Sequence, residues 1–206
     1  MEALSKNLSN LFKKQGKFVV MVRHGESMCN LAGTLAGWTD SRISDHGKKQ
    51  ANLLYSSLHE FYPQFKQIYC SDLQRAVITA QYATLFSWPV VQDERLREIY
   101  FGEHEGEHFD SMTQEMKGLI NHPEYHAPKG ESWPMVMSRA KSFFADSCSA
   151  DGVYLCFSHG GLVCALTYYI GLKEALSNCS AVALRLDESE PKEIDFVWKF
   201  PEITTQ

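Results

Sequence analysis

Three predicted strands of this chain end in polar residues of the same character. The first is the apolar run Phe18 to Val22, which passes directly into a cation, an imidazole and a glycine. A single end of this kind is typical of a strand that turns at the surface. Three of them indicate one shared site. The residues at or just beyond these ends are Arg23-His24-Gly25, Ser71-Asp72 with Arg75, and Ser158-His159-Gly160-Gly161.

Segments of helical periodicity alternate with the strands, which is the pattern of an α/β fold. We therefore predict one domain over residues 1–206, built as a mostly parallel, doubly wound sheet flanked by helices on both faces. In such sheets ligands bind at the carboxyl ends of the strands. The expected strands are 18–22, 67–70, 90–91, 153–157, 181–186 and 194–200, and the expected helices are 3–14, 44–59, 71–83, 132–147 and 161–170.

The first residues, about 1–17, form a short extension ahead of the first strand. Its leucines Leu4, Leu8 and Leu11 follow helical spacing, so we expect an amphipathic helix that packs on the core. Contact with a membrane or a partner is the alternative. At the other end, the strand-like tail 194–200 suits pairing across a homodimer.

Composition excludes several classes of protein. No apolar run approaches the ~18–20 residues of a membrane span, and the start of the chain lacks the apolar centre of a secretion signal. The six cysteines are scattered without a C-x-x-C pair, which favours reduced thiols and a cytoplasmic location. The net charge of −5 argues against a nucleic-acid-binding surface. An anion site must therefore concentrate positive charge locally.

The residues at the three strand ends are suited to a phosphate group. The guanidinium groups of Arg23 and Arg75 match phosphate oxygens, and Asn30 and Ser27 add neutral donors. Gly160, with Gly161 just before a helix, leaves room for an anion at the helix N-terminus. This set predicts a phosphate pocket that needs no metal and no cofactor.

Histidine can act as the nucleophile in covalent catalysis. If one ring nitrogen of His24 donates to a carbonyl, the other nitrogen is held toward phosphorus. We expect His159 to be an imidazolium donor, because a neighbouring phosphoryl group favours the protonated form. The leaving oxygen also needs a proton. The candidates are acidic residues of the stretch from Glu94 to Gly106, and we favour Glu98 over Glu94, Glu103 and Glu105.

Ordered blocks over about residues 18–165 resemble the histidine phosphatase superfamily, the phosphoglycerate mutase-like proteins. The blocks are RHGES with Asn30, GWTDSRISDHGKKQA, SDLQRAVITA with Arg75, LREIYFGEHEG with Glu98, GESW, and FSHGG with His159. The resemblance implies that His24 carries the phosphoryl group and that Glu98 is the proton donor. It also implies that Arg23, Asn30, Arg75 and His159 hold the phosphate, that no metal takes part, and that the sheet is mostly parallel.

The chain departs from the mutases of this superfamily after the segment that carries Glu98. Those mutases resemble one another in an insertion with paired arginines, whereas residues 107–129 contain no arginine and only Lys117 and Lys129. We therefore expect a phosphatase that acts on small phosphorylated metabolites, with a phosphoglycerate mutase as the alternative. A non-catalytic phosphate-binding protein is a further alternative, although the chain retains both the nucleophile and the acid.

Residues 107–130 are a candidate lid over the pocket, in which Met112, Met116, Leu119 and Ile120 suit a mobile apolar helix. The alternative is a helix that simply packs on the domain. Aromatic and apolar side chains would favour an apolar or aromatic leaving group if they faced it. These side chains are Trp38, Phe109, Met112, Tyr125 and Trp133.

Two rival motifs point to other hydrolases. Residues 104–108 match H-E-x-x-H and its reverse, the zinc protease patterns, but the pattern needs a stable helix and Gly106 lies inside it. Ser158 beside His159 suggests a serine hydrolase faintly, because no G-x-S-x-G turn is present.

Overall fold

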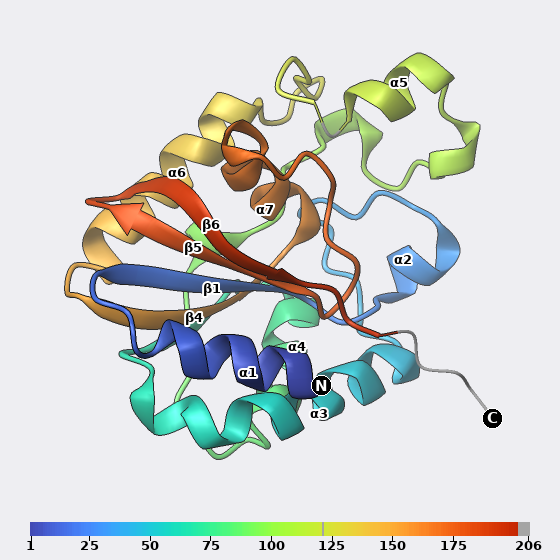
Figure 1. The fold of residues 1–206 in the computed structure, drawn as a ribbon. Helices are drawn as coiled ribbons and strands as arrows, with labels where there is room; N and C mark the ends of the chain where they lie inside the picture. The colour runs from blue at the N-terminus through green and yellow to red at the C-terminus, as the bar shows by residue number, and fades with distance from the viewer. Residues whose placement is uncertain (121, 202–206) are drawn as a thin grey trace.

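The computed structural model describes residues 1–120 and 122–201, and its centre is a six-stranded sheet (Figure 1). The strand order is β3-β2-β4-β1-β5-β6. The first four strands in this order are parallel, β5 runs antiparallel to β1, and β6 runs antiparallel to β5. This confirms the predicted mostly parallel sheet. The strands are β1 Lys17–Arg23, β2 Ile68–Cys70, β3 Val91–Gln92, β4 Gly152–Ser158, β5 Ala181–Asp187 and β6 Glu190–Trp198.

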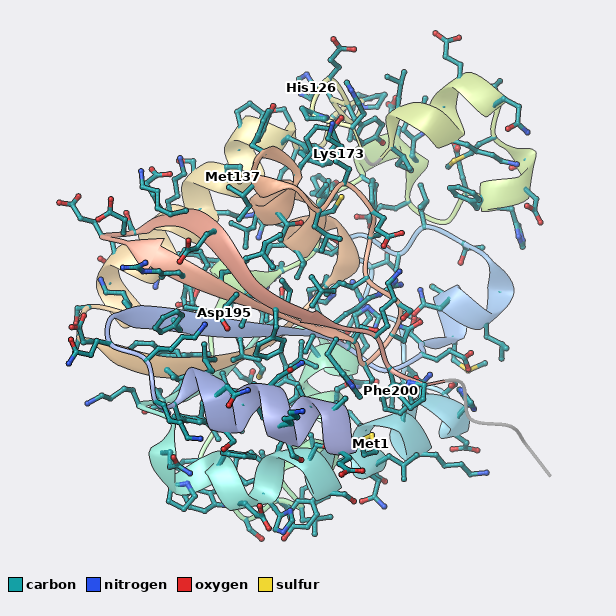
Figure 2. All side chains as sticks on the ribbon, viewed as in Figure 1. Met1, His126, Met137, Lys173, Asp195 and Phe200 are labelled. Atoms are coloured by element: carbon teal, nitrogen blue, oxygen red, sulfur yellow. The ribbon has the colours of Figure 1, made fainter. Side chains whose placement is uncertain are left out.

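Helices cover both faces of the sheet, and side chains fill the space between the helices and the sheet (Figure 2). Helices α1, α3 and α4 lie on one face, and α6 and α7 lie on the other (Figure 1). The short helices α2 and α5 lie toward the end of the molecule where β1 terminates. The helices are α1 Glu2–Leu11, α2 Met28–Ala32, α3 Asp45–Leu58, α4 Gln74–Ala83, α5 Gln114–Leu119, α6 Trp133–Ser147 and α7 Gly160–Thr167. Five 3₁₀ turns also occur in the described residues: His59–Gln64, Glu94–Leu96, Gly102–His104, Phe109–Ser111 and Tyr168–Ile170.

Strand β1 is buried on both faces, which explains why its sequence is apolar without alternation. Val19 and Met21 point into the hydrophobic core under α6 and α7, while Phe18, Val20 and Val22 point into the core under α1, α3 and α4. Successive side chains of a strand face opposite sides, so a strand covered on both faces is apolar throughout. The strand therefore has no solvated face until it ends at Arg23, where the chain leaves both cores.

The extension ahead of β1 packs on the core, as predicted. Leu4, Leu8 and Leu11 of α1 are fully buried against α3 and the sheet. Among the described residues, no helix is long and apolar enough to cross a bilayer. Strand β6 forms one edge of the sheet, and its pairing across a homodimer stays a prediction.

The start of the helix expected at 71–83, with Ser71 or Asp72 as its N-cap, was wrong. Helix α4 begins at Gln74 with Leu73 as its N-cap, and neither Ser71 nor Asp72 caps it. The hydroxyl of Ser71 accepts the N–H of Leu73 instead, and the carboxylate of Asp72 is engaged by the Arg97 guanidinium, with Nε to Oδ1 at 2.8 Å. Both polar side chains are thus committed to the connection between β2 and α4.

The segment proposed as a lid packs against the domain. Met112 and Ile120 are 8% and 3% exposed and belong to the same hydrophobic cluster as Phe101 and Tyr125. Only one helical turn and the short helix α5 interrupt the segment. The packed arrangement corresponds to the alternative reading of residues 107–130, of which position 121 lies outside the described residues. Movement of this segment stays a prediction.

Candidate active site

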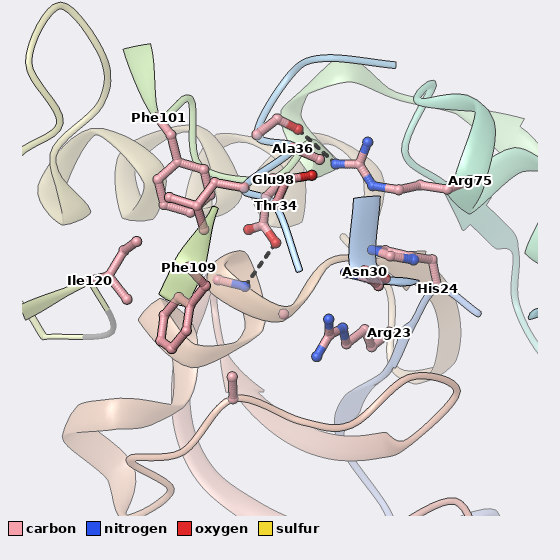
Figure 3. Close-up of a pocket in the computed structure, with 15 residues that line it drawn as sticks. Arg23, His24, Asn30, Thr34, Ala36, Arg75, Glu98, Phe101, Phe109 and Ile120 are labelled. Atoms are coloured by element: carbon pink, nitrogen blue, oxygen red, sulfur yellow. Dashed lines mark hydrogen bonds between the residues drawn. The ribbon is translucent and has the colours of Figure 1, made fainter. Parts of the chain in front are cut away.

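A cavity of about 210 Å³ opens at the carboxyl ends of β1 and β4 (Figure 3). It is the place where the polar strand ends converge. Most of the predicted site residues line it: Arg23, His24, Asn30, Arg75, Glu98 and Gly160. The two remaining predicted residues, Ser27 and His159, are fully buried beside it.

His24 stands directly beyond β1 as a neutral imidazole with one defined tautomer. Its Nδ1 lies 2.7 Å from the carbonyl oxygen of Gly25 and must donate to it, because a carbonyl only accepts. The lone pair is therefore on Nε2. Burial lowers the pKa of His24 well below its usual value, and the positive charges of Arg75 and Arg23 lower it further. A deprotonated Nε2 is the form that can attack an electrophile.

Gly25 is required by a close backbone approach rather than by an unusual turn. A Cβ at this position would lie 2.6 Å from the carbonyl oxygen of Gly47 in α3. The N–H of Gly25 donates to the Thr79 hydroxyl of α4 at 2.9 Å. These contacts hold the carbonyl that orients His24 between two helices.

Two guanidinium groups face the cavity without a carboxylate partner. Arg75 is 1% exposed and donates to the carbonyl oxygens of Gly37 and Thr39 at 2.7 and 3.1 Å. Arg23 donates to the carbonyl of Leu176 at 2.5 Å. Burial lowers the pKa of both groups, yet an arginine in a protein stays charged. Within the described part of the chain, arginine ion pairs are made only by Arg95, Arg97, Arg139 and Arg185. The Glu98 carboxylate attracts both groups but forms an ion pair with neither, so the two positive charges make the cavity a candidate anion site.

Asn30 is oriented so that its amide nitrogen is the available group. Its Oδ1 accepts the N–H of Ser27 at 3.1 Å and the side-chain amide of Asn178 at 3.1 Å. The same Asn178 amide donates to the carbonyl of His24 at 3.0 Å. Asn178 thus ties Asn30 to the backbone of His24, a role that the sequence reasoning missed.

Ser27 does not line the cavity. Its hydroxyl accepts the N–H of Asn30 as the N-cap of α2, and the two residues form a reciprocal capping box. The site that we expected to use Ser27 as a phosphate donor therefore uses it to start the helix that carries Asn30.

His159 lies next to His24, with 5.1 Å between their ring centroids and 59° between the ring planes. It is fully buried, and neither ring nitrogen has a hydrogen-bond partner among the described residues. Burial, and then the charge of Arg75, lower the pKa of His159 well below its usual value. The imidazolium that we expected is thus not the form that this environment favours. An adjacent phosphate would favour it, because a nearby anion stabilises the charged ring.

Glu98 occupies the N-terminus of α7 (Figure 3). Its Oε1 accepts the N–H groups of Ile99 and Leu162 at 2.9 and 3.0 Å, and its Oε2 accepts that of Gly161 at 3.1 Å. The anion that we predicted for this helix N-terminus is therefore the chain's own carboxylate. Glu98 lines the cavity opposite His24, which is where an acid must stand to protonate a departing oxygen.

A family model described as the histidine phosphatase superfamily, branch 1, matches residues 19–197. The chain belongs to this superfamily.

The similar proteins carry the names of different reactions. A protein of Hydrogenobacter thermophilus named phosphoserine phosphatase 2 is 36% identical over 163 residues, which cover 73% of this chain and 79% of that protein. A Klebsiella pneumoniae protein named phosphoglycerate mutase GpmB is 33% identical over 178 residues, which cover 79% of this chain and 81% of that protein. The structure of a mycobacterial glucosyl-3-phosphoglycerate phosphatase with VO3 aligns with a TM-score of 0.77 at 25% identity, covering 90% of this chain and 100% of that one. These relatives support an enzyme that is a phosphatase or a mutase.

Arg139 of α6 binds the backbone of the segment that carries Glu98, and the sequence reasoning also missed this residue. Its guanidinium donates to the carbonyls of Arg95 and Arg97 at 2.7 Å and of Glu98 at 2.8 Å. It also forms a bidentate pair with the Glu131 carboxylate at 2.8 and 3.0 Å. This clamp fixes the backbone that carries Glu98. One signal was available in the sequence, because helical spacing places an arginine beside the buried face of 132–147.

Glu105, a rival for the acid role, holds a loop instead. Its carboxylate accepts the N–H of Trp38 at 2.6 Å, and the N–H and hydroxyl of Thr39 at 2.9 and 2.6 Å. This loop supplies the two carbonyls that bind Arg75. The other rivals lie away from the cavity, since Glu94 is exposed and Glu103 pairs with Lys129 at 2.6 Å.

The rival hydrolase motifs lack the geometry that they need. Gly102–His104 is a single 3₁₀ turn and Gly106 has φ +85°, so residues 104–108 do not form the helix of a zinc protease. No group of three or more potential metal ligands gathers within 1–120 and 122–201. Ser158 is fully buried and donates to the carbonyl of Leu96 at 2.8 Å, which removes it as a nucleophile.

Most of the aromatic and apolar side chains proposed for the leaving group lie elsewhere. Phe109 lines the cavity, whereas Met112, Tyr125 and Trp133 are buried in the core under α6 and α7. Trp38 lies under the Arg97 guanidinium and donates its Nε1–H to the carbonyl of Glu98 at 2.8 Å.

Proposed function

We propose that this protein is a metal-independent phosphomonoesterase that acts on small phosphorylated metabolites through a phosphohistidine intermediate. Nε2 of His24 attacks phosphorus while the ester P–O bond breaks, and Glu98, entering the reaction protonated, gives its proton to the departing oxygen. Water then attacks the phosphohistidine and gives its proton to Glu98, so that inorganic phosphate leaves and His24 is restored. Each step uses a group that lines the cavity.

The observation that carries the proposal is the state of His24 beside two unpaired guanidinium groups. The Gly25 carbonyl fixes the tautomer, and burial with Arg75 and Arg23 keeps Nε2 deprotonated. The same arginines supply fixed positive charge where the transferring phosphoryl group is most negative. Such preorganised electrostatics are the main source of catalysis in phosphoryl transfer.

Hydrolysis rather than mutase activity is favoured by the segment that follows Glu98. The two lysines of residues 107–129 are engaged outside the cavity: Lys117 donates to the Asp110 carbonyl at 3.3 Å, and Lys129 pairs with Glu103. Neither lines the cavity, so among the described residues a second phosphate or a carboxylate finds no cation there other than Arg23 and Arg75. A mutase needs such a cation, because it must hold an intermediate that carries two phosphate groups. The relatives' names keep mutase activity as the alternative.

The test is phosphate release from a panel of phosphomonoesters by the wild-type protein and His24→Ala. We expect the substitution to lower turnover by at least about 10³-fold, as loss of a nucleophile does elsewhere, without loss of the folded state. His126→Ala, at an exposed histidine, is the matched control and should retain activity.

Near-normal turnover by His24→Ala would refute the assignment. Phosphate binding without turnover by the wild-type protein would favour a non-catalytic role. A parallel assay with 3-phosphoglycerate and 2,3-bisphosphoglycerate separates the alternatives, because a mutase would form 2-phosphoglycerate faster than it releases phosphate.

A further inference from the structure

The cavity has a second wall that the phosphoryl chemistry does not use. Phe101, Phe109 and Ile120 stand together on the side away from His24 and Arg75, with Glu98 between the two sides (Figure 3). Leu35 and Ala175 also line the cavity. A phosphate held by the arginines at one end therefore directs its ester group toward an apolar surface.

This wall is built into the fold. Phe101 and Ile120 are 8% and 3% exposed and belong to the hydrophobic core under α6 and α7, so they present a fixed surface. Phe109 is 37% exposed and stands at the edge of the cavity. A ligand that covers this exposed aromatic ring removes apolar surface from water, which favours binding.

The charges around the wall disfavour an anionic leaving group. Arg23 and Arg75 are the only cations among the described residues that line the cavity, and both are needed at the phosphate end. Lys117 contacts Phe109, but its Nζ lies over the ring at 5.4 Å and donates to the carbonyl of Asp110, outside the lining. A carboxylate on the leaving group would therefore be desolvated at this wall without a cation to pair with.

The cavity is also small. Its volume of about 210 Å³ is below the ~300–1,000 Å³ of common ligand pockets. A phosphate with a single ring or a short alkyl chain suits this volume better than a nucleotide or a disaccharide phosphate.

We infer that the preferred substrates are monophosphates of small, uncharged apolar alcohols, with an aromatic ring favoured, and that carboxylate-bearing phosphates are poor substrates. The inference rests on the proposed phosphatase function and narrows it. It also separates this chain from relatives whose names refer to phosphoserine and phosphoglycerate.

The test compares kcat/KM for 2-phenylethyl phosphate, ethyl phosphate and phosphoserine. All three release a primary alcohol, so the differences report the wall rather than the ease of departure. We expect 2-phenylethyl phosphate to exceed ethyl phosphate by at least about tenfold, because even one methylene in an apolar pocket has an effect of that size. Phosphoserine should be slower than ethyl phosphate.

Two variants locate the effect. Phe109→Ala should lower the ratio of kcat/KM for 2-phenylethyl phosphate over ethyl phosphate by at least about threefold, through loss of apolar contact area. Phe86→Ala, at an aromatic that is 66% exposed and outside the cavity, is the matched control and should leave the ratio unchanged.

Failure of the substrate preference and failure of the phosphatase assignment would give different results. Turnover that depends on His24 but favours phosphoserine, or a ratio that Phe109→Ala does not change, would overturn the inference and leave the phosphatase assignment intact. Turnover of all three esters by His24→Ala would instead overturn the proposed function.

Discussion

At the scale of single residues, the site depends on which polar atoms are already engaged. The Nδ1 of His24 is bound to a carbonyl and the Oδ1 of Asn30 accepts two N–H groups, so each side chain presents only one remaining nitrogen to the cavity. Glu98 accepts three backbone N–H groups, which hold its carboxyl group in one place at the cavity.

We predict that Glu98→Gln slows alkyl phosphates by at least about 10²-fold and p-nitrophenyl phosphate far less, because a nitrophenolate leaves without a proton. The measurement is kcat/KM for both ester types in the wild-type protein and the variant. Glu94→Gln, at an exposed carboxylate of the same segment, is the matched control and should behave as wild type. Equal losses on both esters would remove Glu98 from the acid role.

The sequence predicted residues whose role follows from a strand end. Arg23, His24 and His159 follow from the positions of β1 and β4, and strands of this kind can be recognised as short apolar runs in the sequence. Ser27 and Asn178 show the limit of this approach. A serine near a predicted site can serve as donor or as helix cap, and only the backbone geometry decides between them. Asn178 lies in a loop that carries no periodic signal.

At the scale of elements, the N-terminus of α7 fixes the distance between the acid and the sheet. The N–H groups of Gly161 and Leu162 bind the Glu98 carboxylate, and Gly161 has no side chain to obstruct it. A Cβ at Gly161 would lie 2.5 Å from Oε1 of Glu98. The glycine that we first interpreted as space for phosphate is therefore space for the Glu98 carboxylate.

Gly161→Ala should consequently lower kcat for alkyl phosphates by about tenfold or more while the protein stays folded, since small displacements of catalytic groups cost this much. The loss should be smaller for p-nitrophenyl phosphate, as with Glu98→Gln. Gly118→Ala in α5, where a Cβ would meet no atom within 4 Å, is the control. An unchanged kcat for alkyl esters in Gly161→Ala would show that Glu98 does not need this contact.

Element positions were predicted well and their ends less well. The covered strands and the amphipathic helices follow apolar periodicity, so α3 and α6 differ from prediction by only a residue or so at their ends. The start of α4 was misplaced because Ser71 and Asp72 bind other partners. The loop around Thr39, the Glu131–Arg139 clamp and the packing of 107–130 depend on contacts between distant segments, which periodicity does not encode.

At the scale of the whole molecule, the fold buries two histidines in their neutral form. Burial lowers the pKa of both His24 and His159 well below about 6.5, while in the unfolded chain they titrate near that value. Between the folded and unfolded pKa values the unfolded state binds more protons, so the free energy of unfolding decreases as pH falls below about 6.5. Each histidine contributes at most about 1.4 kcal/mol per pH unit in that window.

The double variant His24→Gln, His159→Gln should therefore lose less stability than the wild-type protein between about pH 7 and about pH 5. Urea denaturation at the two pH values measures the difference. His126→Gln, at an exposed histidine, should follow the wild-type dependence. An acid destabilisation of the same size in the double variant would contradict the burial of two neutral imidazoles.

The proposed hydrolysis depends on a covalent bond between phosphorus and one imidazole nitrogen, and this bond can be trapped. The wild-type protein is mixed with p-nitrophenyl phosphate, quenched in alkali, where phosphohistidine survives, and digested for peptide mass spectrometry. We predict one phosphoryl group on the peptide that contains His24, at a level that rises in Glu98→Gln because attack by water slows. Steady turnover with no phosphoryl group on His24, or with one on another residue, would rule out His24 as the nucleophile.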